Sequence, residues 1–314
     1  MKIRQVKFVL IALISVGLIG MVIRIASSSS SDLILSGLLP ISPEVITKVT
    51  LESSESKVEL VRTGDDKIGY NWRVGAYEAF IYKASRFWEI VDQINGAQLI
   101  ATNPNNHDLM GVDESQGIIV SFYLGQSIQE QFILADAPPG IRLCYLRRSG
   151  NDDVYGIPCP YPKLFDPDPD GWRDPIITAI PSSEIDYLVF KYPDEEFILK
   201  LVGGMWAVSR DSTEYPADPY QMSSILNSVE LLVASGFAKE DISRNLKFDP
   251  NDVSIRIVTK QESSAPTTRL RFLKRDDISY YVSTFASPTV YILDNSVTEN
   301  LIKTSQDLLA WTNQ

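Results

Sequence analysis

The clearest chemical pattern in this chain is a run of aspartates that alternate with prolines. The run Asp166-Pro167-Asp168-Pro169-Asp170-Gly171 matches the first half of a calcium-binding loop, in which carboxylates two residues apart supply oxygen ligands. Asp174 occupies the ninth position of such a loop, but the twelfth holds Ile177 where a glutamate is expected. An acidic connecting turn and a calcium site are both open interpretations. The ligands of the calcium site would be Asp166, Asp168, Asp170 and Asp174.

The two cysteines, Cys144 and Cys159, are the second candidates. Cys144 lies on a strand-like stretch over residues 141–146, and a second stretch follows over 154–157 after a turn rich in Gly, Asn and Asp. Folding this hairpin brings Cys144 close to Cys159, so a disulfide is one expectation for a protein outside the cytosol. Two separate buried thiols are the alternative, because prolines flank Cys159 on both sides.

Other reactive groups do not form a known catalytic pattern. His107 is the single histidine and follows a polar, turn-forming run, so a zinc site built on two histidines is excluded. The chain has no Gly-x-Ser-x-Gly elbow, no phosphate-binding glycine loop with lysine and no dinucleotide fingerprint. We therefore expect no catalytic residues, and no cofactor other than the calcium considered above.

Paired carboxylates offer the remaining route to catalysis, through a hydrolase that uses two acids. Each pair falls in a predicted turn, where solvated side chains are the expected state. A carboxylate hydrolase therefore ranks behind the non-enzymatic functions. The pairs are Asp65-Asp66, Asp152-Asp153, Glu195-Glu196 and Asp276-Asp277.

The elements that position these residues are predicted to occur in two copies. The strand that carries Trp72 recurs as the strand that carries Trp206, and Tyr82, at the opening of a helix, recurs as Tyr220. Equivalent landmarks lie about 136 residues apart. A tryptophan repeated at one strand position is expected to anchor a core rather than to stack on a ligand.

Each copy is predicted to be an α+β unit, a mostly antiparallel sheet with an amphipathic helix packed on one face. The helices are predicted at 81–94 and 222–233, and a final helix at 297–311. The strands of the first copy are predicted at 46–51, 57–62, 117–123 and 130–134. Those of the second are predicted at 185–190, 197–201, 253–258 and 269–273.

An N-terminal segment is predicted to cross a membrane once. The apolar run begins at Phe8, follows three basic residues, and extends to Ala26 if Arg24 snorkels to the membrane surface. A cleaved signal peptide is the alternative, because the run is slightly short for a hydrocarbon core. The excess of basic residues ahead of the run places the N-terminus in the cytoplasm and the bulk of the chain outside.

The charge balance limits the partners. Lys and Arg number 29 against 40 Asp and Glu, which gives a net charge of −11. An acidic body repels phosphate backbones, so nucleic-acid binding is not expected.

The sequence divides into a tip and anchor at 1–26, a linker at 27–44, and repeats at 45–181 and 182–314. The apolar part of the linker is open to three interpretations: packing on the body, contact with the membrane surface, or contact with a partner.

Several short motifs carry a resemblance to a known family. Those of the first copy are Trp72-Arg73-Val74, Leu109 with Gly111-Val112-Asp113, Tyr145-Leu146-Arg147 with Val154-Tyr155, and Trp172-Arg173-Asp174. Those of the second are Trp206, Pro216-Ala217-Asp218, and Tyr281 with Val290-Tyr291. Between residues 46 and 309 the chain resembles a bacterial family catalogued as domain of unknown function 4340. The second copy departs from the pattern, because no Trp-Arg-Asp segment follows its hairpin.

The resemblance implies an anchored extracytoplasmic protein whose relatives are often encoded beside ABC-type export permeases and gliding-motility-like auxiliary proteins. It carries over no catalytic residues. We expect a non-enzymatic accessory or scaffold module of the cell membrane, with one membrane-spanning helix and a membrane-protein partner such as an ABC-type permease. The alternative is an extracytoplasmic module that binds a wall polymer, a sugar or calcium.

Overall fold

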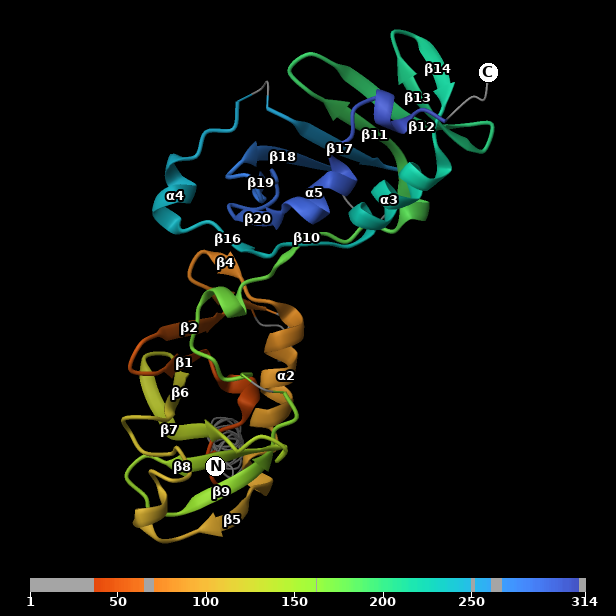
Figure 1. Cartoon of the computed structure of the whole chain (residues 1–314). Helices are drawn as coiled ribbons and strands as arrows, with labels where there is room; N and C mark the ends of the chain where they lie inside the picture. The colour runs from red at the N-terminus through yellow and green to blue at the C-terminus, as the bar shows by residue number, and fades with distance from the viewer. Residues whose placement is uncertain (1–36, 65–70, 162, 250–251, 261–266, 311–314) are drawn as a thin grey trace, which may run out of the picture. The chain divides into compact units, whose positions relative to one another are not determined.

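The computed structural model describes residues 37–64, 71–161, 163–249, 252–260 and 267–310 (Figure 1). The chain divides into two compact units, of which the first ends at Arg173 and the second begins at Asp174. This division falls a few residues before the boundary that the sequence predicts after residue 181. Each unit buries its own hydrophobic core.

The first unit is built on a nine-stranded sheet, and every strand pairing described in it is antiparallel. The order across the sheet is β4-β3-β2-β1-β6-β7-β8-β9-β5. The strands are β1 (Lys48–Glu52), β2 (Lys57–Arg62), β3 (Trp72–Val74), β4 (Tyr77–Glu78), β5 (Gln98–Ala101), β6 (Ile118–Leu124), β7 (Ser127–Asp136), β8 (Leu143–Arg148) and β9 (Val154–Pro158).

The second unit contains another nine-stranded antiparallel sheet, with the order β14-β13-β12-β11-β17-β18-β19-β20-β16. A two-stranded sheet pairs β10 (Ile176–Thr178) with β15 (Leu232–Val233). The strands of the large sheet are β11 (Ile185–Lys191), β12 (Glu196–Val202), β13 (Met205–Arg210), β14 (Thr213–Pro216), β16 (Gly236–Phe237), β17 (Ser254–Thr259), β18 (Thr268–Lys274), β19 (Ser279–Ser283) and β20 (Val290–Asp294).

The two large sheets have the same topology. In each large sheet a four-stranded meander is followed by a helix, a short strand at the opposite edge, and a second four-stranded meander whose first strand pairs with the first strand of the first meander. The helix is α2 (Ile81–Val91) in the first unit and α3 (Pro219–Glu230) in the second. The two large sheets therefore share one strand order, which agrees with the internal repeat that the sequence landmarks predict.

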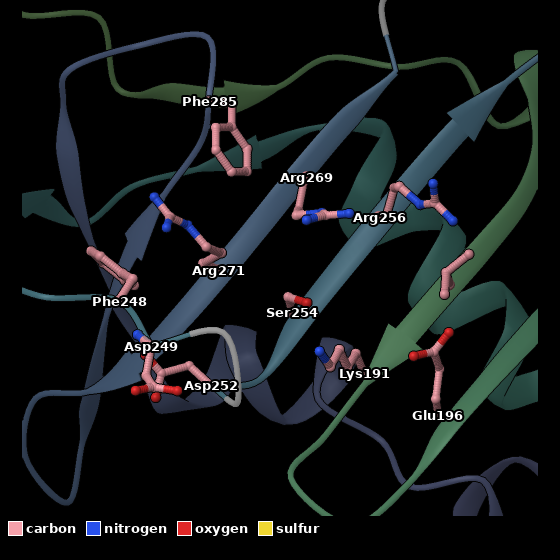
Figure 2. A pocket seen from close by; sticks show the side chains of 11 residues that line it. Lys191, Glu196, Phe248, Asp249, Asp252, Ser254, Arg256, Arg269, Arg271 and Phe285 are labelled. Atoms are coloured by element: carbon pink, nitrogen blue, oxygen red, sulfur yellow. Dashed lines mark hydrogen bonds between the residues drawn. The ribbon is translucent and has the colours of Figure 1, made fainter.

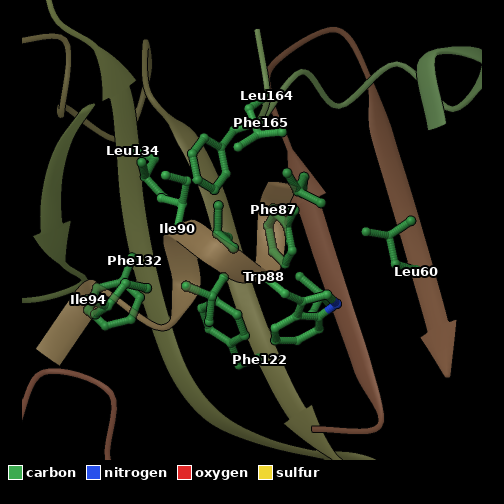
Figure 3. Packing of buried hydrophobic residues seen from close by; sticks show 14 of the residues in the cluster. Leu60, Phe87, Trp88, Ile90, Ile94, Phe122, Phe132, Leu134, Leu164 and Phe165 are labelled. Carbon is green, nitrogen blue, oxygen red and sulfur yellow. The ribbon is translucent and has the colours of Figure 1, made fainter. Parts of the chain in front are cut away.

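Helix α2 packs on the sheet of the first unit (Figure 3). Its apolar residues recur at three- and four-residue steps, which places them on one face of the helix. The rings of Phe87 and Trp172 lie 5.6 Å apart, as do those of Phe87 and Phe165. Each large side chain buried in this way contributes about 1.5–3 kcal/mol of transfer free energy. The buried residues of α2 are Ala84, Phe87, Trp88, Ile90 and Val91.

Helix α3 occupies the same place in the chain order of the second unit. It begins at Pro219, where a missing amide costs no hydrogen bond, and Asp218 accepts bonds from the amides of Tyr220 and Gln221, each at 2.9 Å. Its buried face carries Met222, Ile225 and Val229. Two further helices, α4 (Glu240–Asn245) and α5 (Asn295–Leu301), complete the unit.

Each unit is closed by a 3-10 turn that contacts the residue ahead of its main helix. In the first unit the Phe80 amide donates to the Trp172 carbonyl at 2.7 Å, and in the second the Asp218 amide donates to the Leu308 carbonyl at 2.8 Å. Trp172 and Leu308 are both fully buried. The sequence of the second copy has no Trp-Arg-Asp segment after its hairpin, but the turn that contains Leu308 makes the same backbone contact there as Trp172 makes in the first unit.

The repeated aromatic landmarks separate into two groups. Trp72 is buried and Trp206 is half-buried against its core, as predicted for anchoring tryptophans. Tyr82 and Tyr220 are 66% and 80% exposed, so the tyrosine at the start of each main helix faces solvent.

The predicted helix boundaries are partly wrong. Helix α3 ends at Glu230, and the last two residues assigned to it by periodicity form β15, which pairs with β10. The final helix predicted at 297–311 ends at Leu301, and the 3-10 turn Gln306–Leu308 follows. Sheet pairing and tertiary contacts decide the conformation of these short apolar stretches, whose spacing fits both helix and strand.

The part of the linker that the structure describes packs on the first unit. Leu39 is 1% exposed and Ile41 is also buried in the core. The side chain of Asn95 holds Leu39 in place: its Oδ1 accepts from the Leu39 amide at 2.8 Å, and its Nδ2 donates to the Leu39 carbonyl at 3.2 Å. Of the three interpretations of the apolar linker, packing on the body therefore describes residues 39–41.

The predicted membrane anchor, from Phe8 to Ala26, lies outside the described residues. Among the residues that the structure does describe, no helix has both the length and the apolar character needed to cross a membrane.

Candidate functional site

The candidate site lies on the outer face of the second unit's sheet. Along β17, Ile255 and Ile257 are buried in the core, so the intervening Arg256 points to the opposite face. Along β18, Leu270 and Phe272 are buried, and Arg269 and Arg271 alternate with them on that same outer face. Strand parity alone therefore gathers three arginines on one surface of an acidic protein.

These arginines line a cavity of about 350 Å³ (Figure 2). We call it the arginine pocket and define it by the cations Lys191, Arg256, Arg269 and Arg271, the hydroxyl of Ser254, and the phenyl rings of Phe248 and Phe285. The volume lies at the lower end of the range for small-molecule sites.

Arg256 and Arg269 occupy directly opposed positions in the β17–β18 register. Opposed residues on one face of an antiparallel pair have Cβ atoms about 5 Å apart, so the two guanidinium groups start from neighbouring positions. Figure 2 shows both side chains on adjacent strands at the same side of the pocket. Neither arginine forms an ion pair with any residue that the structure describes.

Arg271 is held between the two aromatic walls. Its guanidinium carbon lies 4.7 Å from the ring centre of Phe285 and 4.9 Å from that of Phe248. Such cation–π contacts favour the charged side chain and fix its direction. The Nε atom of Arg271 is buried and has no hydrogen-bond partner among the described residues. A buried donor left in that state costs about 1–3 kcal/mol.

The acidic residues of the pocket stand apart from the Arg256–Arg269 pair in Figure 2. Asp252 Oδ2 accepts a bond from the Asp249 amide at 2.6 Å, which ties this carboxylate to its own turn. Glu196 lies on β12, opposite Lys191 of β11.

A comparison with the first unit shows what is distinctive about this face. The last pair of the β1–β2 hairpin is Glu52 with Lys57, and the last pair of the β11–β12 hairpin is Lys191 with Glu196. Lys57 Nζ lies 2.6 Å from Glu52 Oε2 in the first unit. In the second unit the two charges are exchanged, and no ion pair joins these two described residues.

When the two sheets are aligned on these hairpin pairs, the strand registers make Ser121 of the first unit equivalent to Arg256 of the second, and Gln131 equivalent to Arg269. Gln131 Nε2 donates to Ser121 Oγ at 2.9 Å. The first unit therefore places a neutral, hydrogen-bonded pair where the second places two like charges.

The residue that corresponds to Arg271 is Ile133. Ile133 is buried with Val112 and Val154 in a small apolar cluster on the outer face of the first sheet. The same location in one topology is thus filled with hydrophobic side chains in the first unit and lined with cations in the second.

The structure does not gather the four aspartates proposed as calcium ligands. Asp166 Oδ1 accepts from the Asp168 amide at 3.0 Å, and Asp168 Oδ1 accepts from the Asp170 amide at 3.1 Å. Asp170 Oδ1 lies 2.9 Å from Arg173 NH1, and Asp174 Oδ1 accepts from the Ile176 amide at 3.0 Å. Among the described residues no three of these carboxylates share a metal-sized site. Local hydrogen bonds to the turn account for the acidic pattern.

This acidic segment supports the closing turn of the first unit. Trp172 Nε1 donates to the Asp166 carbonyl at 2.7 Å, and Lys83 Nζ lies 4.2 Å from the centre of the Trp172 ring. Burial lowers the pKa of Lys83, and the nearby charges of Asp166 and Asp168 oppose that shift. The acidic run is therefore part of the packing around Trp172.

Cys144 and Cys159 are joined in the structure, with their sulfur atoms 2.13 Å apart. Cys144 is paired with Ile157 in the β8–β9 register, which brings Cys159 within reach. Asp136 lies beside the bridge, and its carboxylate is close enough to form a metal-sized cluster with the two sulfurs. The bond between the sulfurs leaves no thiolate to bind a metal there.

His107 and the acid pairs have local roles. His107 Nε2 lies 2.8 Å from the carbonyl oxygen of Asp152. Glu195 accepts from the Ser305 hydroxyl at 2.7 Å, and Asp276 accepts from the Ser279 hydroxyl at 2.7 Å. That hydrogen bond lowers the pKa of Asp276. The pair Asp65-Asp66 lies outside the described residues.

The arginine pocket was missed by sequence reasoning, although part of its signal was available. The predicted strands at 253–258 and 269–273 contain the arginines at alternate positions. Parity would have placed them on one face. The sequence alone does not specify the strand register that pairs Arg256 with Arg269.

The comparisons with known proteins identify a family and nothing closer. No curated protein and no solved structure matches this chain. A family model described as domain of unknown function (DUF4340) matches residues 72–250, which span more than half of the sequence and both units. The chain therefore belongs to the DUF4340 family, a domain of unknown function.

Proposed function

We propose that this chain is a non-enzymatic binding module whose second unit holds an anionic ligand in the arginine pocket. The supporting observation is the opposed pair Arg256 and Arg269, which has no acidic partner among the described residues. Two guanidinium groups held together repel each other, and an oxyanion that bridges them converts the repulsion into charge-assisted hydrogen bonds. The ligand class is therefore a phosphate- or carboxylate-bearing molecule.

The residues of the pocket favour binding over chemistry. Arginine stays protonated at every physiological pH, so Arg256, Arg269 and Arg271 supply charge and hydrogen bonds but do not transfer protons. The single histidine, His107, belongs to the first unit and contacts a backbone carbonyl there. A ligand-binding module was the alternative raised by the sequence, and the pocket favours an anion over calcium or a neutral sugar.

The proposal includes the setting in which the module works. The apolar segment from Phe8 to Ala26 supports a single-pass anchor with the bulk of the chain outside the cytoplasm. The bridge between Cys144 and Cys159 is compatible with an oxidising compartment. The family resemblance supports an accessory role beside a membrane protein such as an ABC-type permease. Nucleic acid is not proposed as a ligand, because the net charge is −11.

The test exchanges the arginine pair for its counterpart in the first unit. The double variant Arg256→Ser/Arg269→Gln recreates the neutral arrangement of Ser121 and Gln131. Isothermal titration with inorganic phosphate and with citrate is expected to show binding to the wild type and at least a tenfold loss in the double variant. Lys274→Gln, which removes an exposed cation from the end of β18, is the matched control and is expected to bind normally.

Two results would contradict the proposal. One is a wild-type protein that binds neither anion at millimolar concentrations and low salt. The other is a double variant that binds as tightly as the wild type.

A further inference from the structure

We infer that the ligand of the arginine pocket carries two anionic groups, each held by a separate row of side chains across the sheet. This inference rests on the proposed function and adds to it the spacing of charges that the ligand must have. It follows from the register of β11, β17 and β18, which arranges the cations of the pocket in two parallel rows.

The first row is the opposed pair of Arg256 and Arg269. Beyond it on β11 lies Val189, which is buried and adds no charge. The row therefore concentrates two cations on neighbouring strands, a geometry that suits one oxyanion bound by two guanidinium groups.

The second row consists of Lys191, Ser254 and Arg271, which are aligned across β11, β17 and β18. The hydroxyl of Ser254 stands between the two cations and offers a hydrogen-bond donor. Arg271 reaches this row in a fixed direction, because Phe248 and Phe285 flank its guanidinium group. The row is thus a second anion-binding element. It shares β17 and β18 with the first row, but its donors are different and it adds Lys191 of β11.

The distance between the rows sets the spacing of the two charges. Neighbouring residues on one face of a strand are two positions apart, which corresponds to about 7 Å. A single phosphate bound between Arg256 and Arg269 leaves the second row without a ligand, whereas two anionic groups joined by a short spacer can occupy both rows together. Phe285, which is 70% exposed, adds an apolar wall beside Arg269 and Arg271 for that spacer.

The experiment compares ligands that differ in the number and spacing of phosphates. Isothermal titration of the full chain would use inorganic phosphate, methylene bisphosphonate, and propane-1,3-diol bisphosphate, whose three-carbon spacer matches the separation of the rows. The propanediol bisphosphate is expected to bind at least about 30-fold more tightly than phosphate, because the second contact becomes intramolecular. Methylene bisphosphonate, with its phosphorus atoms much closer together, is expected to gain little.

Single variants test which row binds which anionic group of the ligand. Arg271→Gln is expected to abolish the advantage of the bisphosphate while phosphate binding at the first row persists, and Arg269→Gln is expected to weaken both ligands. Lys274→Gln serves as the control, and thermal unfolding confirms that each variant is folded.

The outcomes separate this inference from the proposed function. Equal affinity for phosphate and propanediol bisphosphate, or an advantage that survives Arg271→Gln, overturns the two-row ligand and leaves anion binding in place. Failure of every anion to bind overturns both.

Discussion

Arg256 of β17 and Arg269 of β18 oppose each other in the antiparallel register, so two like charges share one cross-strand position. Like charges placed directly opposite one another destabilise a sheet. The pair therefore has a cost to folding that a structural role does not explain. Sites kept for binding commonly carry such a cost.

Replacing the pair with its neutral counterpart should stabilise the second unit. Arg256→Ser/Arg269→Gln is expected to raise the free energy of unfolding by up to about 1 kcal/mol. Either single substitution already removes the repulsion, so the two effects should be non-additive. Urea denaturation of the wild type, both single variants and the double variant measures the coupling. A double variant less stable than the wild type would show that the arginines support the fold.

Removing the indole of Trp172 should destabilise the first unit strongly. Trp172 is fully buried, contacts Phe87 and donates a hydrogen bond to the Asp166 carbonyl. Trp172→Ala is expected to cost about 3–5 kcal/mol, and Trp172→Phe less. Met205→Ala, at a site that is 72% exposed, is the control and should stay within about 0.5 kcal/mol of the wild type.

Urea denaturation with hydrogen exchange of β6 assigns that loss to the first unit. Protection of β6 that is unchanged in Trp172→Ala would show that the closing turn is dispensable for this core.

The bridge between Cys144 and Cys159 should contribute measurably to the stability of the first unit. The two cysteines are 15 residues apart in the sequence. Closing a loop of that size lowers the conformational entropy of the unfolded chain, which stabilises the folded state by about 3 kcal/mol. Reductant is expected to lower the urea midpoint of the wild type. It should leave the double variant Cys144→Ala/Cys159→Ala unchanged. A wild-type midpoint that does not respond to reductant would favour the alternative of separate buried thiols.

The turn before β6 should give the protein a specific response to acid. The Ser115 hydroxyl donates to Asp113 Oδ1 at 2.7 Å, and this bond, with the backbone bond from Ser115, lowers the pKa of Asp113. The folded state then binds fewer protons than the unfolded state, so this stabilisation is present above the unfolded pKa of about 4 and is lost as the pH falls through the lower, folded pKa.

Ser115→Ala is expected to raise the pKa of Asp113 and to flatten the loss of stability below about pH 4. Carboxyl-detected NMR titration measures the pKa directly, and Ser127→Ala on the exposed start of β7 is the control. An Asp113 pKa that does not move in Ser115→Ala would assign the shift to other donors.

Much of the fold could be predicted from local patterns. The alternation of apolar and polar residues in the sequence placed β2 at its observed bounds, and it placed β11 and β17 within one residue of theirs. The repeated landmarks predicted two related units, because equivalent elements recur in the same order. These features depend on neighbours in sequence, which is why they are readable without a structure.

The strand order and the site depend on contacts that the sequence does not specify. Helix α2 carries the chain from one edge of the sheet to the other, and β6 then pairs with β1 at the centre. No local pattern encodes that long-range pairing. The acidic run near Asp168 is a candidate site in the sequence because its residue types match a known motif, and an acidic connecting turn is the alternative. Its carboxylates bond within the turn instead, and the cavity lies among arginines that match no motif.

The burial of Leu39 has a consequence for reach. Leu39 is fixed in the core of the first unit. If the predicted anchor ends at Ala26, about a dozen residues connect the anchor to Leu39, and a connection of that length can span at most about 40 Å. The first unit would then stay within roughly one domain diameter of the lipid, close enough to touch an integral membrane protein beside it but too tightly held to search the space beyond.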